Sequence, residues 1–435
     1  MLTAAASVIR AKRDHFIPVR KADILDALVE HGALAKDQLR HFRRLCRLLA
    51  AIYHYRYFDR LERLRADYFY FNPELEPHAR FGAAARERAY ANLRKTFDGV
   101  LANANFVEIP HAEIERAHGE RATVRVAIKT SLDDYREVRF FRRGQHQAAF
   151  EVADWFGLRR RKVEAAVYDD VVLFVAMKPQ EEIASGRELK RLAVRKLRPD
   201  SVLIKYFRNV ARADLSALFP NVRVVMSNFD KLTFGVPAIV GGVPIVLNLA
   251  STLTVLFVVI GFYLGISGVV HEDEVKKALA ALSGLAALGG FLLQQWVKYQ
   301  RQSLKYQKVL SDNVYFRNVN NNAGIFDYLV GAAEEQECNE AFLAFYFLHA
   351  AKAPLTRSAL EELIETWLSA TFGVDCNFEV GEALHKLEGL GLLSRDGERL
   401  SVPALDEALA RLARVWANFF PGDKGGGSDG AAGVD

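Results

Sequence analysis

The sequence predicts an α+β membrane protein with a helical N-terminal region, a mostly antiparallel α+β domain, a two-span transmembrane helical hairpin and a C-terminal winged-helix-like domain. The main observation is a run of 39 residues without a charge, 232–270, followed after a short polar link by 20 more, 278–297. About 20 apolar helical residues cross the hydrocarbon core of a bilayer. Two further observations are period-two apolar alternation between 105 and 227, typical of strands, and helical apolar spacing on either side of it.

At 435 residues the chain is long enough for two or three domains. Its three cysteines are widely separated and form no CxxC pattern, which disfavours a disulfide scaffold or a structural zinc site and favours a reducing compartment. In chain order, the expected parts are a helical N-terminal region (1–105), an α+β domain (106–230), the transmembrane hairpin (232–297, with spans at about 244–266 and 278–297), a juxtamembrane helix with an Asn-rich turn (298–333), the winged-helix-like domain (334–420) and a flexible tail (421–435).

The N-terminal region is expected to be helical. In KADILDALVEHG, Ile24 and Leu28 have the spacing of one helix face, and Gly32 supplies a stop. Longer helices are expected at 36–71, before an Asn-Pro pair, and at about 79–101. The start of the chain becomes charged too early to hold the apolar core of a secretory signal, so we expect the internal spans to direct insertion.

The α+β domain is expected to contain one sheet of five or six mostly antiparallel strands. Asp169-Asp170 is predicted to form a tight turn, and helices are expected at 111–117 and 213–219. The predicted strands cover 123–129, 137–142, 163–168, 171–177, 202–207 and 222–226.

Two basic clusters in this domain are candidates for binding an anion or a lipid headgroup. A loop that presents arginine beside glycine could hold a phosphate, because the guanidinium fork matches phosphate geometry and glycine lets the backbone approach. The alternatives are arginines that pair with internal acids, or a solvated basic face. The clusters are Arg142, Arg143 and Gly144, and Arg159, Arg160, Arg161 and Lys162. Nucleotide and hydrolase motifs such as GxGxxG, GxxxxGK[ST], HExxH and GxSxG do not occur, so no catalytic residue and no cofactor is predicted.

The hairpin carries small residues that allow two helix backbones to approach closely. Gly261 and Gly265 have this spacing in the first span, and Gly284 and Gly290 belong to similar pairs in the second. We therefore expect the hairpin to pack on itself or on another copy of the chain, as a homo-oligomer. The alternative is a hairpin buried in a large soluble core, but a soluble core helix is seldom apolar all round for this length.

The charge of the chain is polarised along its length. Residues 1–230 carry 42 Lys and Arg against 30 Asp and Glu, a net of +12, whereas residues 334–420 carry 7 against 15, a net of −8. A basic stretch also follows the second span. By the positive-inside rule, the flanks of both spans belong in the cytoplasm, so both termini are expected there and the link 271–277 is expected to face outward. The predicted location is a bacterial inner membrane or, for an organellar relative, a mitochondrial membrane.

Several segments carry a family resemblance: HFIPVRKADILDAL, DDYREVRFFRRG, RADLSALFP, FGVPAIVGGVP and NVYFRNVNNNAGIFDYLVGAAEEQECNEAFLAFYFLHAA. Together they resemble the membrane-protein family defined by domain of unknown function 3754, which is transmembrane protein 143-like. The resemblance spans nearly the whole chain and implies two spans and a membrane location, without catalytic residues. The chain departs from the pattern at Asn320-Asn321-Asn322, where the resemblance implies an acid before an asparagine pair.

The C-terminal part is acidic. Glu334, Glu335 and Glu337 are expected to contact the basic N-terminal regions, with Arg142 and Arg143 as the first partners considered. No histidine lies near these acids, so no metal site is predicted. Helices at 355–368, 380–390 and 404–419 with a hairpin at 392–402 indicate a winged helix. Because this domain is acidic, nucleic acid is not an expected partner.

Three hypotheses for function follow from these patterns. The first is a membrane-anchored scaffold or regulatory protein whose cytosolic domains lie at the bilayer surface and contact anionic lipids. The second is a membrane enzyme acting on a phosphorylated or lipid substrate. The third is an oligomeric channel or transporter, which is disfavoured because neither span contains an ionisable residue.

Overall fold

The computed structural model describes residues 14–75, 82–114, 127–129, 135–154, 159–183, 197–220, 223–225, 257, 259–262, 264–265 and 271–419. They belong to two compact units. Unit 1 combines Met1–Glu113, Asp133–Arg212 and Asn318–Asp435, and unit 2 combines Ile114–Leu132 and Ala213–Arg317. The units do not follow the expected linear order of domains, because segments from both sides of the uncharged stretch share one core. The expected tail, 421–435, lies outside the described residues.

Three helices open unit 1, as the sequence predicts. They are α1 (Lys21–Glu30), α2 (Lys36–Tyr68) and α3 (Ala83–Asn103). Gly32 lies just after α1 with a φ of 79°, a conformation that glycine adopts readily and that ends the helix.

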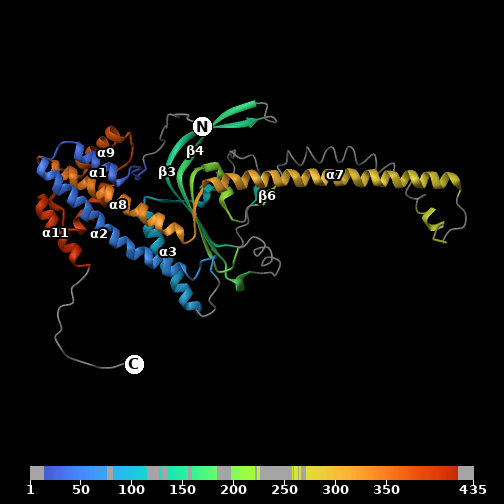
Figure 1. Cartoon of the computed structure of the whole chain (residues 1–435), viewed down its shortest axis with the longest axis horizontal. Helices are drawn as coiled ribbons and strands as arrows, with labels where there is room; N and C mark the ends of the chain where they lie inside the picture. The colour runs from blue at the N-terminus through green and yellow to red at the C-terminus, as the bar shows by residue number, and fades with distance from the viewer. Residues whose placement is uncertain are drawn as a thin grey trace, which may run out of the picture. The chain divides into compact units, whose positions relative to one another are not determined.

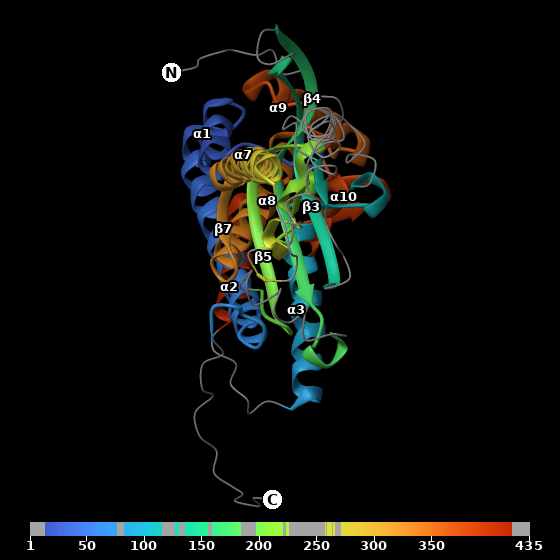
Figure 2. The ribbon, with the colours of Figure 1, turned by 90° about the vertical axis from the view of Figure 1, so that its right-hand side faces the viewer.

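A five-stranded antiparallel sheet forms the second layer of unit 1 (Figures 1 and 2). Its strand order is β1 (Val107–Ile109), β3 (Tyr135–Asp154), β4 (Arg159–Met177), β5 (Val202–Ala211) and β7 (Asn318–Asn321). One face of the sheet packs on α3 and α8: the ring of Phe97 contacts Phe141 and Phe174, and the ring of Tyr206 contacts Tyr328. The mostly antiparallel sheet predicted from the sequence is therefore confirmed.

One expected turn is a strand instead, and a second is preceded by a short strand. Asp169-Asp170 does not end a strand, because β4 runs through it and the buried Asp170 carboxylate pairs with Arg143 across the sheet. The strands expected at 163–168 and 171–177 are thus one strand. In the Asn-rich segment, Asn318–Asn321 form β7, which adds an edge to the sheet by pairing with β5, and Asn322, with a φ of 51°, begins the expected turn before residue 324.

Helix α8 (Gly324–Ala350) runs through the centre of unit 1. It is buried along most of its length and packs against α1, α2, α3, α9 and α10. The elements that follow occur where the sequence predicts them: α9 (Arg357–Phe372), α10 (Val380–Gly389), the hairpin of β8 (Ser394–Asp396) and β9 (Arg399–Ser401), and α11 (Leu405–Ala417). Residues in the range 334–420 share one hydrophobic core with the N-terminal helices.

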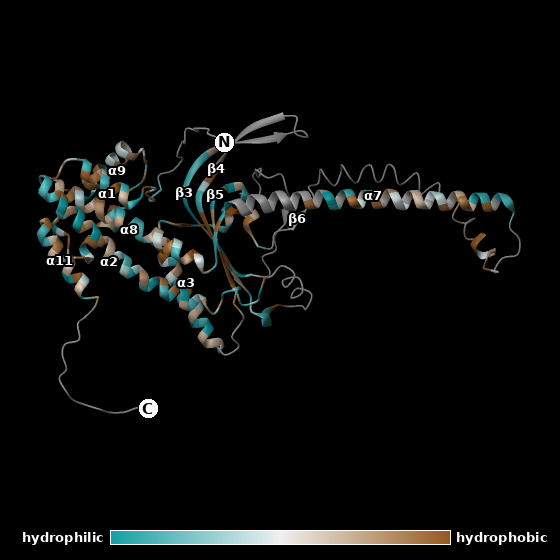
Figure 3. Cartoon of the chain, viewed as in Figure 1, coloured by the Kyte–Doolittle hydropathy of each residue, from teal (hydrophilic) through white to brown (hydrophobic). Residues whose placement is uncertain are grey.

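Unit 2 contains a short sheet of β2 (Ala127–Lys129) and β6 (Arg223–Val225), and the 46-residue helix α7 (Glu272–Arg317). The helix expected at 213–219 is a 3₁₀ helix, η2 (Arg212–Leu218). One stretch among the described residues, Val275–Lys298 in α7, is long and apolar enough to cross a membrane, and it contains the expected second span (Figure 3). The first expected span, 244–266, lies almost wholly outside the described residues.

Gly261 and Gly265, expected on one helix face, have different backbone conformations. Gly261 is helical, but Gly265 lies in a turn with a φ of 77°, and its backbone N–H donates to the carbonyl of Phe262. Gly265 therefore ends the helix rather than lining its face. In α7, no atom lies within 4 Å of the position that a Cβ of Gly290 would take, and Gly284 is half-buried.

Candidate functional site

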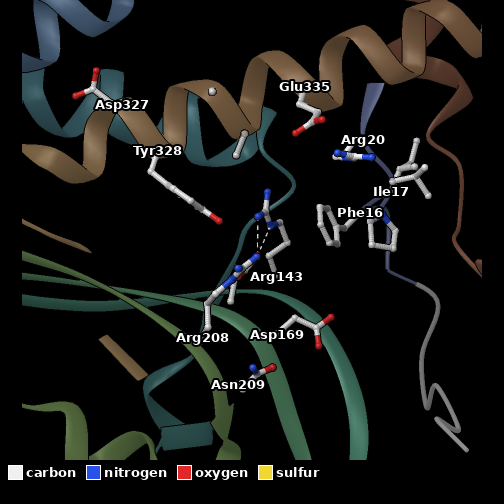
Figure 4. A pocket seen from close by; sticks show the side chains of 15 residues that line it. Phe16, Ile17, Arg20, Arg143, Asp169, Arg208, Asn209, Asp327, Tyr328 and Glu335 are labelled. Atoms are coloured by element: carbon white, nitrogen blue, oxygen red, sulfur yellow. Dashed lines mark hydrogen bonds and ion pairs between the residues drawn. The ribbon is translucent and has the colours of Figure 1, made fainter. Parts of the chain in front are cut away.

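A cavity of about 750 Å³ lies within unit 1, between α8 and the sheet (Figure 4). This volume is in the range of small-molecule sites. Its walls come from three parts of the chain that are far apart in sequence. The lining residues are Phe16, Ile17, Pro18, Val19, Arg20, Arg143, Asp169, Asp170, Arg208, Asn209, Asp327, Tyr328, Gly331, Ala332 and Glu335.

The centre of the cavity floor is a buried ion pair. Arg143 donates to one carboxylate oxygen of Asp170 from Nε at 2.9 Å and from Nη2 at 2.6 Å, and only about 5% of either side chain is exposed. The other oxygen of Asp170 accepts from the hydroxyl of Tyr206 and, at 3.3 Å, from Nε of Arg208. Burial, followed by the charge of Asp170, raises the pKa of Tyr206, so its hydroxyl stays protonated and donates. The trio Arg143, Asp170 and Arg208 carries one net positive charge, and the rest of the lining adds the charged residues Arg20, Asp169, Asp327 and Glu335.

Two aromatic rings enclose the Arg143 guanidinium. Its central carbon lies 4.2 Å from the ring centroid of Phe16 and 4.7 Å from that of Phe106. Such cation–π contacts are favourable and keep water from the ion pair. Arg143 is therefore held on one side by a carboxylate and on the others by aromatic faces.

The Phe16 wall is held in place by side chains of α8. Gln336 clamps the backbone of Ile17, accepting from its N–H and donating to its carbonyl, both at 3.0 Å. Asn339 donates to the carbonyl of Val19 at 2.9 Å. The extended segment before α1 is thus tied by its backbone to the central helix, and this fixes one end of the cavity.

A row of irregular positions crosses the three central strands at the cavity. The strand registers place Gly144 of β3 and Asn209 of β5 level with Asp169 of β4. Gly144 has a φ of 66° and Asn209 a φ of 52°. A Cβ on Gly144 would lie 2.1 Å from the Asp169 carboxylate, so only glycine fits, and Asp169 is free to pair with His146.

The cationic clusters expected to bind an anion have different surroundings from those predicted. Arg142 and Arg143 lie within a strand rather than in a loop, and both have internal acids as partners, Asp14 and Asp170 respectively. Pairing with internal acids is one of the alternatives given above to anion binding. Arg159, Arg160, Arg161 and Lys162 begin β4, opposite residues 151–154 of β3; their side chains are outside the described part of the chain.

The acidic residues of α8 contact basic groups, but not Arg142 or Arg143. Glu334 accepts from the ammonium of Lys21 at 2.6 Å and pairs with His54, and Glu335 accepts from the backbone N–H of Lys21. Glu337 pairs with Lys386 of α10 at 3.3 Å. The carboxylates of Glu334 and Glu337 are largely buried, whereas the exposure of their partners ranges from 12% for Lys386 to 75% for His54.

Glu340, which the sequence does not single out, completes this acidic cluster. It is buried and pairs with Lys386 together with Glu337. Burial raises the pKa of Glu340 to about 7 and also raises the pKa of Glu337. Burial opposes the charge on Lys386, yet the two carboxylates raise its pKa above the ordinary value.

Sequence reasoning missed Arg208, Asn209 and Tyr328. Residues that favour turns do occur beside them in the structure, namely Gly144 and Asp169-Asp170. In the structure these residues mark the irregular positions across the sheet rather than turns. Across the described residues, no group of three or more His, Cys, Asp or Glu side chains is placed to hold a metal ion.

Part of the chain matches a known family model. Residues 168–324 match the family model described as protein of unknown function (DUF3754). The matched range includes Asp169, Asp170, Arg208 and Asn209 of the cavity and the whole of α7. A domain of unknown function is therefore identified in this part of the chain. No solved structure matches.

Proposed function

We propose that this chain is a membrane-anchored scaffold or regulatory protein, held by a two-span hairpin, with unit 1 in the cytosol at an anionic membrane surface. The observation that carries the proposal is the pairing of β5 with β7. β5 precedes the uncharged stretch and β7 follows it, yet both belong to one sheet. A sheet cannot be shared across a bilayer, so any membrane crossings by the chain between these strands must be even in number.

The exposure of α7 supports the use of that helix as one of the two spans. Only 8% of its most apolar window is buried, and large apolar side chains such as Leu279, Leu293 and Trp296 are 58 to 66% exposed. A core helix of a soluble protein would bury these side chains, as α8 does. The other membrane span is assigned to the uncharged run 232–270, which is long enough to cross a bilayer.

Cysteine labelling tests this topology. The three native cysteines are buried, so the background is low, and Asp273 is exposed at the start of α7. We expect Asp273→Cys in sealed vesicles to react only from the side opposite the cytoplasm, while tags on both ends are accessible from the cytoplasm. Tags found on opposite sides, or release of the chain by alkaline carbonate without detergent, would contradict the proposal.

An enzyme acting on a phosphorylated substrate is less well supported. That alternative depends on Arg142 and Arg143 as phosphate ligands, and both are occupied by internal acids. The hairpin proposal does not depend on either residue.

A further inference from the structure

The cavity of unit 1 persists because α8 presents small side chains to it. Gly331 and Ala332 form its roof, and no atom lies within 4 Å of the position that a Cβ of Gly331 would take. Elsewhere α8 is packed closely, with Leu329 and Ala333 fully buried. A hollow of this volume beside a close-packed helix has the size of a small-molecule site.

The floor of the cavity has features that stability alone does not require. Burying Arg143 with Asp170 carries a large desolvation cost, and an apolar pair of similar volume is often as stable. The backbone of Asn209 is held at a φ of 52°, which is uncommon for a residue other than glycine. Charged clusters and strained backbone together are typical of functional sites.

Arg208 is the cation at this floor with donors to spare. Its Nε contacts Asp170 at 3.3 Å, its side chain is 55% exposed, and Asp170 is already neutralised by Arg143. In Figure 4 the hydroxyl of Tyr328 points toward the guanidinium groups of Arg143 and Arg208. Asn209 follows Arg208 on the same wall and adds an amide donor.

We propose that this cavity binds a phosphate group, carried by a small soluble molecule or by a lipid headgroup, with Arg208, Asn209 and Tyr328 as its donors. A guanidinium fork matches two oxygens of a phosphate, and further donors around it can reach the remaining oxygens of a tetrahedral oxyanion. Apolar residues such as Phe16 and Val19 line the other end, where the organic part of the ligand would lie. This site is independent of the membrane hairpin.

The test is binding of phosphate by the purified full-length chain in neutral-lipid nanodiscs. Equilibrium dialysis with labelled inorganic phosphate measures binding of a soluble phosphate. Binding of a lipid headgroup is measured as a change in the thermal unfolding midpoint when phosphatidic acid replaces phosphatidylcholine in the nanodiscs. Sodium chloride at equal ionic strength controls for salt. We expect one phosphate per chain, or a raised midpoint with phosphatidic acid alone if the source is lipid.

Two variants and a matched control decide the site. Arg208→Gln removes the main donor, and Gly331→Leu fills the roof while favouring the helix; each should weaken binding at least about tenfold. Arg395→Gln removes an arginine of similar exposure that pairs with Glu388 outside the cavity, and it should bind as the wild type does. Equal binding by Arg208→Gln, or no effect of either phosphate source on the wild type, would overturn the proposal.

Discussion

At the scale of single residues, the cavity floor depends on Asp170. This carboxylate is the shared acceptor of Arg143, Tyr206 and Arg208, and it is almost completely buried. Removing one partner of a buried ion pair leaves the other charged group without compensation, which costs far more than losing an exposed pair.

Asp170→Asn should therefore lower the free energy of unfolding by about 3 to 5 kcal/mol. Chemical denaturation of the full-length protein in detergent, followed by tryptophan fluorescence, measures this. The control is Asp23→Asn, which breaks an exposed pair with Arg20 and should cost far less than Asp170→Asn. Similar losses in both variants would show that the buried pair has no special role.

Glu340 should make stability depend on pH. Its pKa is about 7 in the folded chain, against an ordinary value of 4.5, so between these values the folded state binds more protons than the unfolded state. The free energy of unfolding therefore falls as pH rises through this window, by about 3 kcal/mol at most from this group.

Glu340→Gln should flatten the decline in stability between pH 4.5 and 7, because it removes the titrating group and leaves Glu337 to pair with Lys386. Denaturation at a series of pH values measures the slope. Glu388→Gln, which removes an exposed acid paired with Arg395, should leave the slope unchanged. Parallel curves for wild type and Glu340→Gln would contradict this account.

At the scale of elements, α7 and α8 are both apolar helices with opposite surroundings. α8 is buried by other helices and the sheet, whereas the apolar window of α7 is 8% buried. The length of an apolar stretch does not by itself distinguish a core helix from a membrane span. The exposure of its apolar side chains in the folded chain does.

Ala287→Arg, in the middle of the apolar window of α7, should reduce membrane insertion, because a central arginine costs about 2.5 to 3.5 kcal/mol on insertion scales. Leu304→Arg is the control: it lies in the same helix, is 62% exposed, and falls beyond the window. Carbonate extraction of membranes measures the insertion of both variants. If the two variants are extracted to the same extent, α7 is not a span.

At the scale of the whole molecule, the N-terminal and C-terminal regions meet through apolar surface. The core contains Phe42 and Leu49 of α2 together with Phe345 of α8 and Leu412 of α11. The opposite charges of these regions predict an electrostatic contact that salt would weaken. Instead, the contact between the two regions consists mainly of buried apolar side chains, and the ion pairs of α8 lie within or beside this apolar core.

A protease site inserted between Asp230 and Lys231 should leave both fragments associated after cleavage. Because the contact is apolar, they should co-purify in detergent at low salt and at 1 M sodium chloride alike. Size-exclusion chromatography of the cleaved protein measures this. Separation of the fragments at high salt alone would restore the electrostatic account.

The sequence by itself determined the local elements of this protein. Helix α1 with its Gly32 stop, the hairpin around Gly397 and the apolar window of α7 follow from residue spacing and turn chemistry, which act over a few residues. Such short-range preferences can be recognised without knowing what lies across the core.

The tertiary structure alone decided which distant residues meet. Asp170 carries a turn signal but lies mid-strand, because Arg143 and Arg208 on neighbouring strands neutralise it. Residues Asn318–Asn321 become β7 because β5 offers an unpaired edge, and the cavity stays open because the α8 residues Gly331 and Ala332 that line it are small. Each outcome depends on partners more than 25 residues away, and burial by such partners overrides local preference.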